Sequence, residues 1–200
     1  MVKLFVEGGG NHKTLRTECR KSFTIFLIKA GLSGKMPRVV ASGPRSKAYD
    51  DFCAAVKNQE HAMMLIDSEA VAEITSYHPW SILSKNKTDK WKKPEGSSDK
   101  HCHLMVVCME SWFLADLDAL SNFYGSNFNK NDLIKKINNI ENTPKELLFD
   151  LLENATKKCK TKSKYVKNEH SFKLLALLNP KKVEAASGWA KRLFDELKNL

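Results

Sequence analysis

The chain has 200 residues, 42% hydrophobic and 28% charged, a balance that predicts a globular protein with a sizeable core and excludes a largely disordered one. No apolar run approaches the ~18 residues of a membrane span, and the N-terminus carries no signal-peptide cleavage region. We therefore expect a cytoplasmic protein that spans no membrane. The formal net charge of +10 favours a polyanionic partner such as nucleic acid, although basic proteins also bind acidic proteins.

The five cysteines are spread along the chain without a C-x-x-C motif. Their odd number, and the apolar surroundings of Cys19, Cys53 and Cys108, are typical of reduced, buried thiols and do not fit a disulfide framework. The triplet at 101–103, His-Cys-His, suggests zinc, but alternation along a strand would put the cysteine on the opposite face from both histidines. We interpret the triplet as the edge of a strand.

An apolar run closed by an acid and three glycines, VKLFVEGGGN, opens the chain and predicts a strand buried on both faces of a parallel sheet. Apolar residues then recur every three or four positions over 11–31, which predicts a helix with Asn11 as N-cap and Gly31 as its stop. If the glycines form the turn into this helix, free backbone N–H groups beside Glu7 could hold a phosphate. A plain tight turn explains them equally well.

A second strand-helix unit follows. Residues 37–43, PRVVASG, predict a short strand, and the helix expected over 46–59 has an inner face made of Tyr49, Phe52, Cys53 and Val56. Alternating strands and helices predict parallel strands with right-handed crossovers. Arg45 lies at the turn between them, on the carboxyl side of the sheet, where it would contact a phosphate or form a surface salt bridge.

The third predicted strand, MMLID, ends in acid, because Asp67 and Glu69 close it. A short helix is expected over 79–83, and the apolar pattern then disappears over 85–100, a stretch with six lysines that predicts an exposed loop. Its lysines, which include Lys90, Lys92 and Lys93, could bind nucleic acid beside Trp91 as a stacking platform. Alternatively, Trp91 anchors a solvated loop to the body.

A fourth strand, HLMVVCM over 103–109, places Glu110 at the same edge of the predicted sheet, and a helix is expected over 110–124. Glu110 would complete a metal site or serve as a carboxylate favoured by the dipole of that helix. Asp116 and Asp118 lie further along the helix, where we expect them to face water or to cap neighbouring groups.

The acids at the strand ends carry the main chemical prediction. Residues just past the carboxyl ends of parallel strands meet in one crevice, where open α/β sheets place their chemistry. Glu7, Asp67 and Glu69 would repel one another there unless a hard divalent cation neutralised them. The sequence therefore predicts Mg²⁺ or Mn²⁺ bound by these three residues.

From residue 126 onward the pattern predicts helices alone, over 131–137, 144–156 and 179–200. The stretch 157–167 between the last two carries six lysines and no acid. Such a block is usually solvated, but close to a metal centre it could hold a phosphate backbone. The lysines that we consider for this role are Lys162, Lys164 and Lys167.

Four segments in this order resemble the Toprim superfamily, whose catalytic domain is shared by topoisomerases, bacterial primases and overcoming-lysogenization-defect nucleases. The segments are FVEGGG, LIDSEA, CMESWFLAD and HSFKLL, and they run nearly end to end in a chain similar to one bacterial branch of roughly this length. The predicted fold is α/β, a Toprim-like (Rossmann-like) sheet of about four mostly parallel strands flanked by helices. We expect a catalytic core over 1–125 and a helical extension over 126–200 packed on it.

The resemblance implies a metal-dependent nuclease that cleaves DNA or RNA. Asp67 and Glu69 would hold the metal, Glu7 would act as a further ligand or as the base, and Glu110 and His170 would join them as catalytic residues. His170 begins a short helix, where a structural hydrogen bond is the alternative role. The acidic pair ends in Glu69 instead of the commoner Asp, and Asn11 stands where a Toprim loop carries another acid, which leaves one metal or two open.

Related nucleases act with an ABC-type ATPase, so the resemblance also implies a regulated effector in phage defence. A second hypothesis is a binding subunit with a Toprim-like scaffold that docks on an ATPase or on nucleic acid and performs no chemistry. A third is nucleotidyl transfer of the primase kind, against which the short chain argues because no zinc-binding or template-gripping domain is apparent. A shared edge strand would give a homo-oligomer.

Overall fold

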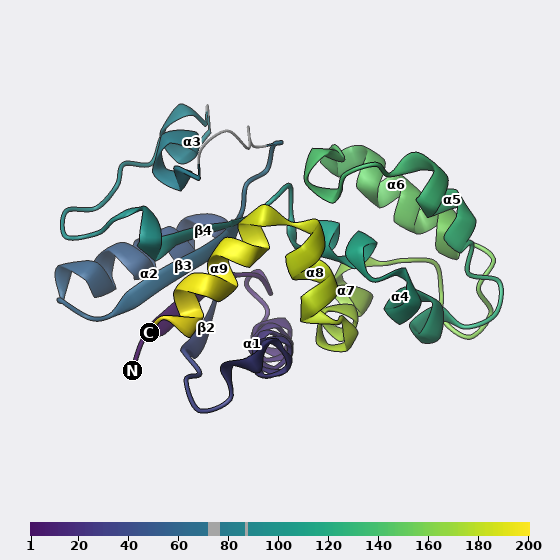
Figure 1. Ribbon diagram of the computed structural model, residues 1–200, viewed down its shortest axis with the longest axis horizontal. Helices are drawn as coiled ribbons and strands as arrows, with labels where there is room; N and C mark the ends of the chain where they lie inside the picture. The colour runs from purple at the N-terminus through teal and green to yellow at the C-terminus, as the bar shows by residue number, and fades with distance from the viewer. Residues whose placement is uncertain (72–76, 87) are drawn as a thin grey trace.

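Four parallel strands form the centre of the computed structural model, which describes residues 1–71, 77–86 and 88–200. The strands lie in the order β2-β1-β3-β4 (Figure 1). They are β1 (Lys3–Glu7), β2 (Arg38–Gly43), β3 (Ala62–Asp67) and β4 (Cys102–Met105). Each comes from an apolar run of the sequence, and the predicted parallel α/β sheet flanked by helices, with a helical C-terminal part, is confirmed. Strand β4 ends four residues earlier than the 103–109 run suggested.

Alternate strand residues face two layers of helices. Phe5, Met64 and Leu104 belong to a core with α2 (Arg45–Lys57) and α3 (Pro79–Lys85). Leu4 and Leu65 belong to the opposite core, with α1 (Lys13–Leu27) and α9 (Gly188–Lys198). Because both faces are covered, every residue of β3 is buried.

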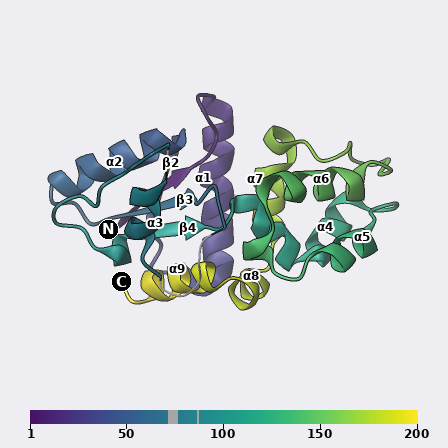
Figure 2. The ribbon, with the colours of Figure 1, turned by 90° about the horizontal axis from the view of Figure 1, so that it is seen from above.

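The remaining helices gather beyond the carboxyl ends of β3 and β4 (Figure 2). They form a lobe of short helices, η3 (Met109–Ala115), α4 (Leu117–Tyr124), α5 (Lys130–Lys136), η4 (Ile140–Asn142), α6 (Lys145–Thr156), α7 (Lys167–Leu177) and α8 (Pro180–Ala186). The chain then returns to the sheet through α9, whose Arg192 donates to the carbonyl oxygen of Cys102 at 2.9 Å. The C-terminal residues thus both cover the strand ends and complete the core.

Three helices differ from the sequence-based expectation. The helix expected over 110–124 is broken at Asp116, a 3₁₀ segment (η3) preceding α4, and the Asp116 carboxylate caps α4 by accepting from the N–H of Ala119. The helix expected over 179–200 is likewise broken at Ser187, whose hydroxyl caps α9. Helix α1 has His12 as its N-cap and not Asn11, and it continues through η1 (Ile28–Leu32), where Gly31 with φ of +88° ends the regular turns.

Several side chains predicted to be buried are only half-buried. In α2 the buried residues are Ala48, Phe52 and Ala55, whereas Tyr49, Cys53 and Val56 lie at the rim of the layer. All five cysteines are free. His103 is fully buried and its Nε2 contacts the carbonyl oxygen of Lys100 at 3.0 Å, so the 101–103 triplet is part of the packing at the start of β4.

No helix in the described ranges is both long and apolar enough to cross a membrane.

Two glycine turns cross where β1 and β2 end. A Cβ atom on Gly43, which has φ of +91°, would lie 2.3 Å from the carbonyl oxygen of Gly10. The backbones can therefore approach this closely only without a side chain at Gly43.

This crossing predicts a large and specific cost for Gly43→Ala. We expect the substitution to lower the free energy of unfolding by about 3 kcal/mol, since it adds a backbone clash to an unfavourable φ. Gly34→Ala is the matched control, because Gly34 has nearly the same φ but open space around its Cβ position; its expected cost is about 1 kcal/mol. Urea denaturation measures both, and equal costs would contradict the crossing.

Candidate functional site

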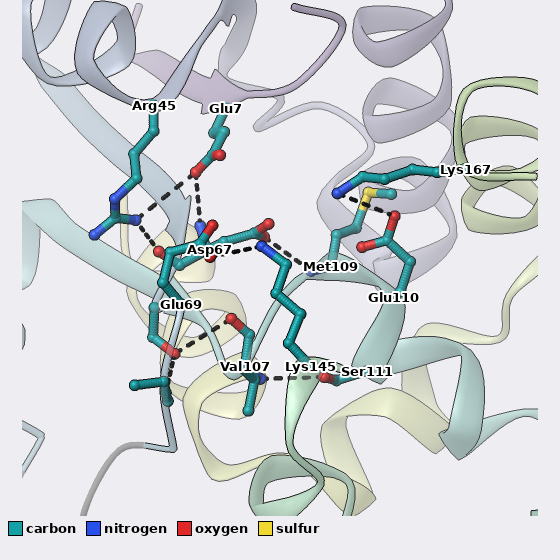
Figure 3. Close-up of polar contacts among 12 residues, drawn as sticks. Glu7, Arg45, Asp67, Glu69, Val107, Met109, Glu110, Ser111, Lys145 and Lys167 are labelled. Atoms are coloured by element: carbon teal, nitrogen blue, oxygen red, sulfur yellow. Dashed lines mark hydrogen bonds and ion pairs between the residues drawn. The ribbon is translucent and has the colours of Figure 1, made fainter. Parts of the chain in front are cut away.

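The ends of β1 and β3 bring three carboxylates together, as the sequence predicts (Figure 3). Glu7 ends β1, Asp67 ends β3, and Glu69 follows two residues later. One oxygen from each carboxylate lies within 4.8 Å of the other two. In the described part of the chain, this is the one group of three or more His, Cys, Asp or Glu side chains close enough to share a metal ion.

Backbone hydrogen bonds hold two of these carboxylates in place. The N–H of Asp67 donates to Glu7 Oε2 at 3.1 Å, and the N–H of Met109 donates to Asp67 Oδ1 at 2.8 Å. Glu69 has φ of +64°, a left-handed conformation that is uncommon outside glycine, and its N–H donates to the carbonyl oxygen of Val107. The chain therefore turns sharply after β3 and remains tied to the segment after β4.

Two basic side chains pair with the acids. Arg45 Nη1 lies 3.7 Å from Glu7 Oε2, and the same guanidinium donates to the Asp67 carbonyl oxygen and to Asp89 Oδ2. Lys145, at the start of α6, places its Nζ 2.6 Å from Glu69 Oε2 (Figure 3). The sequence predicts that Arg45 contacts a phosphate or forms a surface salt bridge. In the structure it pairs with Glu7 and Asp89. Lys145 was missed, because nothing local marks a lysine 76 positions away in the sequence as a neighbour of Glu69.

Two acids of this cluster, Glu7 and Asp67, resist ionisation. Burial raises the pKa of Glu7, an effect that the charge of Arg45 partly opposes. Burial also raises the pKa of Asp67 well above its usual range, and the negative charges of Glu7 and Glu110 raise it further. A positive ion among the three carboxylates would offset this cost, and an all-oxygen donor set suits a hard divalent cation. The residues present therefore fit Mg²⁺ or Mn²⁺.

Glu110 lies beside the cluster and outside the group of three. Its side chain is fully buried, and its Oε1 accepts from Ser171 Oγ at 3.0 Å and from Tyr165 Oη at 3.2 Å. Lys167 Nζ lies 3.6 Å from the same oxygen, whereas Oε2 is buried with no hydrogen-bond partner among the described residues. Glu110 lies in the first turn of η3, which is a 3₁₀ helix and not the α-helix expected over 110–124.

A cavity of about 380 Å³ joins these groups. Its walls include the carboxylate-bearing residues Glu7, Asp67 and Glu110, the glycine turn after β1, and Lys167 and Ser171 from α7. A phosphate group is small enough to enter such a space, where it would meet acids on one side and an ammonium group on the other. The sheet supplies Glu7 and Asp67, and the helical lobe supplies Glu110, Lys167 and Ser171.

His170 lies away from this cavity. Its Nδ1 is 3.2 Å from the N–H of Val166 and 3.1 Å from Tyr124 Oη, and its ring packs against Phe123 and Tyr124. The cavity wall does not include it. His170 is thus placed in the structural role that was the alternative to catalysis.

The predicted basic residues divide into three kinds. Trp91 stacks on Tyr49 with ring centroids 4.4 Å apart, so it anchors the 85–100 loop to α2 and leaves Lys90, Lys92 and Lys93 exposed on the surface; Lys87 of this loop lies outside the described residues. Lys162 and Lys164 are engaged elsewhere, over the Phe123 ring and with Glu153. Of the six lysines over 157–167, Lys167 alone lines the cavity.

A family model described as a domain of unknown function, DUF4276, matches residues 6–198. The chain belongs to the DUF4276 family. The match spans all three cluster acids and the lysines of the lobe. Comparisons with curated proteins and with solved structures find no match. Functional inference for this DUF4276 chain therefore rests on the geometry of its site.

The raised pKa of Asp67 predicts a stability gain for Asp67→Asn. In the unfolded chain this carboxyl ionises near pH 4, whereas the folded protein keeps it protonated to higher pH. The folded state therefore binds more protons, and ionisation lowers stability as pH rises from about 4 through the folded pKa. Without divalent cations we expect Asp67→Asn to raise the free energy of unfolding by about 1 kcal/mol at pH 7 and by less at pH 4.

Asp118→Asn is the control for this experiment, which uses urea denaturation in EDTA. Hydrogen bonds from Lys130 and Lys182 lower the pKa of Asp118 to about 2. Its contribution to stability is present above pH 4 and is lost as pH falls, so its substitution should not stabilise the protein at pH 7. A loss of stability in Asp67→Asn at pH 7 would contradict the account of the cluster.

Proposed function

We propose that this chain is a Toprim-type nuclease that uses Mg²⁺ or Mn²⁺ to hydrolyse phosphodiester bonds in DNA or RNA. The observation that carries the proposal is the convergence of Glu7, Asp67 and Glu69, with ligand oxygens within 4.8 Å of one another at the carboxyl edge of a parallel sheet. The raised pKa values of Glu7 and Asp67 support it, because burial and neighbouring negative charge disfavour their ionised forms, a cost that a bound cation would offset.

The residues of the site have separate roles in this proposal. Asp67 and Glu69 hold the cation, which when bound polarises the phosphoryl oxygen and lowers the pKa of water. Glu7 serves as a further ligand or takes a proton from the attacking water, a role that its raised pKa suits. Lys145 and Lys167 would stabilise negative charge that develops on the phosphate. Arg45 keeps Glu7 in position.

The biological setting is proposed from the Toprim resemblance alone. Related nucleases act with an ABC-type ATPase, so we propose a regulated cytoplasmic effector that acts with such a partner and serves in phage defence. An uncontrolled nuclease endangers its host, which makes control by a partner a reasonable expectation.

A subunit without chemistry is the second candidate, and the ion pairs of the cluster favour it. Arg45 and Lys145 already supply two positive charges to the three carboxylates. In that case, the cluster is a structural ion-pair network that joins the sheet to the helical lobe, and the chain docks on an ATPase or on nucleic acid. Metal binding and cleavage separate the two candidates.

In the first test, we expect the wild-type protein to cleave nucleic acid and the Asp67→Asn variant to lose this activity. Labelled plasmid DNA and tRNA are incubated with the protein and Mn²⁺ or Mg²⁺, with Glu153→Gln as a control on an acid of α6 that pairs with Lys164. We expect the Asp67 variant to be at least about a hundredfold slower, because a metal ion contributes several kcal/mol to such a transition state. Equal rates for wild type and Asp67→Asn would contradict the proposal.

Lys145→Met is expected to tighten Mn²⁺ binding by about tenfold, since the ammonium group lies close enough to Glu69 to repel an incoming cation. Electron paramagnetic resonance of free Mn²⁺ measures the affinity. Lys164→Met, which removes the same charge from a lysine paired with Glu153, should leave it unchanged. If Lys145→Met bound Mn²⁺ no better than Lys164→Met, the ammonium group would not compete with a cation in the cluster.

A further inference from the structure

A basic groove runs along the side of the molecule between α1 and the edge strand β2. Its volume is about 610 Å³, and its walls carry four cationic side chains, Lys13, Arg16, Arg20 and Arg38. The other lining residues are threonines of α1 and residues 37–41, and no acid is among them. Helix α1 precedes strand β2 in the chain, with η1 between them, and the two elements are in contact (Figure 1).

The spacing of the cations along α1 makes one continuous stripe. Lys13, Arg16 and Arg20 recur at three and four residues, the interval that places side chains on one face of a helix. Thr17 and Thr24 lie on the same wall. From residue 13 to residue 24 the wall is about 16 Å long at 1.5 Å per residue. On β2, Val39 and Ala41 pack toward α1 and Val40 packs toward α2. Because side chains alternate along a strand, Arg38 lies at the rim of the groove, and α1 is its cationic wall.

These four side chains are exposed, and none forms an ion pair within the described part of the chain. Some lysines elsewhere differ: Lys130, Lys164 and Lys182 each have an acidic partner. Four unneutralised positive charges in one groove repel one another. A ligand with regularly spaced negative charges would remove this repulsion.

The edge of β2 adds donors to the same groove. Among the described residues, β2 pairs with β1 alone, and the N–H of Arg38 donates to the carbonyl oxygen of Val2 on that side. Because alternate residues of a strand direct their backbone groups to opposite sides, the N–H groups of Val39 and Ala41 point to the open edge. Both residues line the groove. The carbonyl oxygens of these residues point the same way, so the floor offers both hydrogen-bond donors and acceptors beside the cationic wall of α1.

The groove leads toward the carboxylate cluster. Arg16 packs against the glycine turn, because a Cβ atom on Gly9 would lie 2.6 Å from its backbone nitrogen. The metal-site cavity begins on the other side of that turn, where His12 and Leu15 of α1 line it. A strand lying along α1 would therefore reach the cavity that is lined by Glu7 and Asp67 by passing over the glycine turn.

We propose that this groove binds the phosphate backbone of a nucleic acid and guides it to the carboxylate cluster. The proposal rests on the proposed function for the second part, the delivery of a phosphodiester to the acids, whereas binding itself needs no cleavage. The contacts are to phosphates, so recognition is independent of sequence. DNA and RNA share this chemistry.

The test measures binding in EDTA, where cleavage cannot interfere. Fluorescence anisotropy follows the wild-type protein, the triple variant Lys13→Gln/Arg20→Gln/Arg38→Gln and a control triple variant Lys158→Gln/Lys160→Gln/Lys162→Gln, with duplex DNA, single-stranded DNA and a hairpin RNA at several salt concentrations. Both variants lose three positive charges from exposed residues. Arg16 is left intact because it packs on Gly9, and circular dichroism confirms that each variant is folded.

We expect the groove variant to bind at least tenfold more weakly than wild type at 100 mM salt. Its plot of log affinity against log salt should be less steep by about 2 to 3, since each lost phosphate contact removes about 0.7 to 0.9 from the slope. The control triple variant should change the slope by less than one. A larger loss of affinity for DNA than for RNA, or the reverse, identifies which nucleic acid the groove prefers.

Three results would overturn the proposal: unchanged binding in the groove variant, equal losses in both variants, or equally tight binding of a polyglutamate peptide. The second result would mean that net charge alone drives binding, and the third that the groove is an acidic-protein surface. A wild-type protein that binds nucleic acid through the groove but never cleaves it would contradict the proposed nuclease and leave the groove assignment standing.

Discussion

Repulsion among three carboxylates at the ends of β1 and β3 is the constraint on which this site depends. Glu7 and Asp67 are shielded from water at the ends of their strands, and each carboxylate accepts a hydrogen bond from a backbone N–H group. Arg45 and Lys145 bring two positive charges, which leaves the three acids with a formal charge of −1 before any cation binds. Burial and like charge disfavour this arrangement, and under the proposed function a divalent cation would offset that cost.

The helical lobe is part of the site and of the core. Lys145 of α6 pairs with Glu69, and Lys167 and Ser171 of α7 line the cavity, so residues that follow the sheet in sequence contribute to the site. Helix α9 then covers the same face of the sheet as α1. Because one stretch of chain both stabilises the sheet and completes the cavity, substitutions in the lobe should affect stability and site chemistry together.

The strand ends and their acids could be predicted from sequence, because a buried strand is a local apolar run and parallel strands share one carboxyl edge. The prediction of Glu7, Asp67 and Glu69 as neighbours needed no more than this. Lys145 could not be found, since its contact with Glu69 depends on how the lobe folds over the sheet. The same holds for His170: its place among Phe123, Tyr124 and Tyr165 is set by tertiary packing. The break at Asp116 was missed because its capping role interrupts an otherwise helical apolar pattern.

A crystal structure of the wild-type protein grown with Mn²⁺, with anomalous scattering recorded to locate the ion, would show directly whether the carboxylate cluster binds a divalent cation. We expect an anomalous peak in contact with oxygens of Glu7, Asp67 and Glu69. Lys145 Nζ should then be displaced from its position 2.6 Å from Glu69 Oε2. An absence of any peak at saturating Mn²⁺, with the Lys145 to Glu69 pair intact, would contradict the account and identify the cluster as a structural ion-pair network.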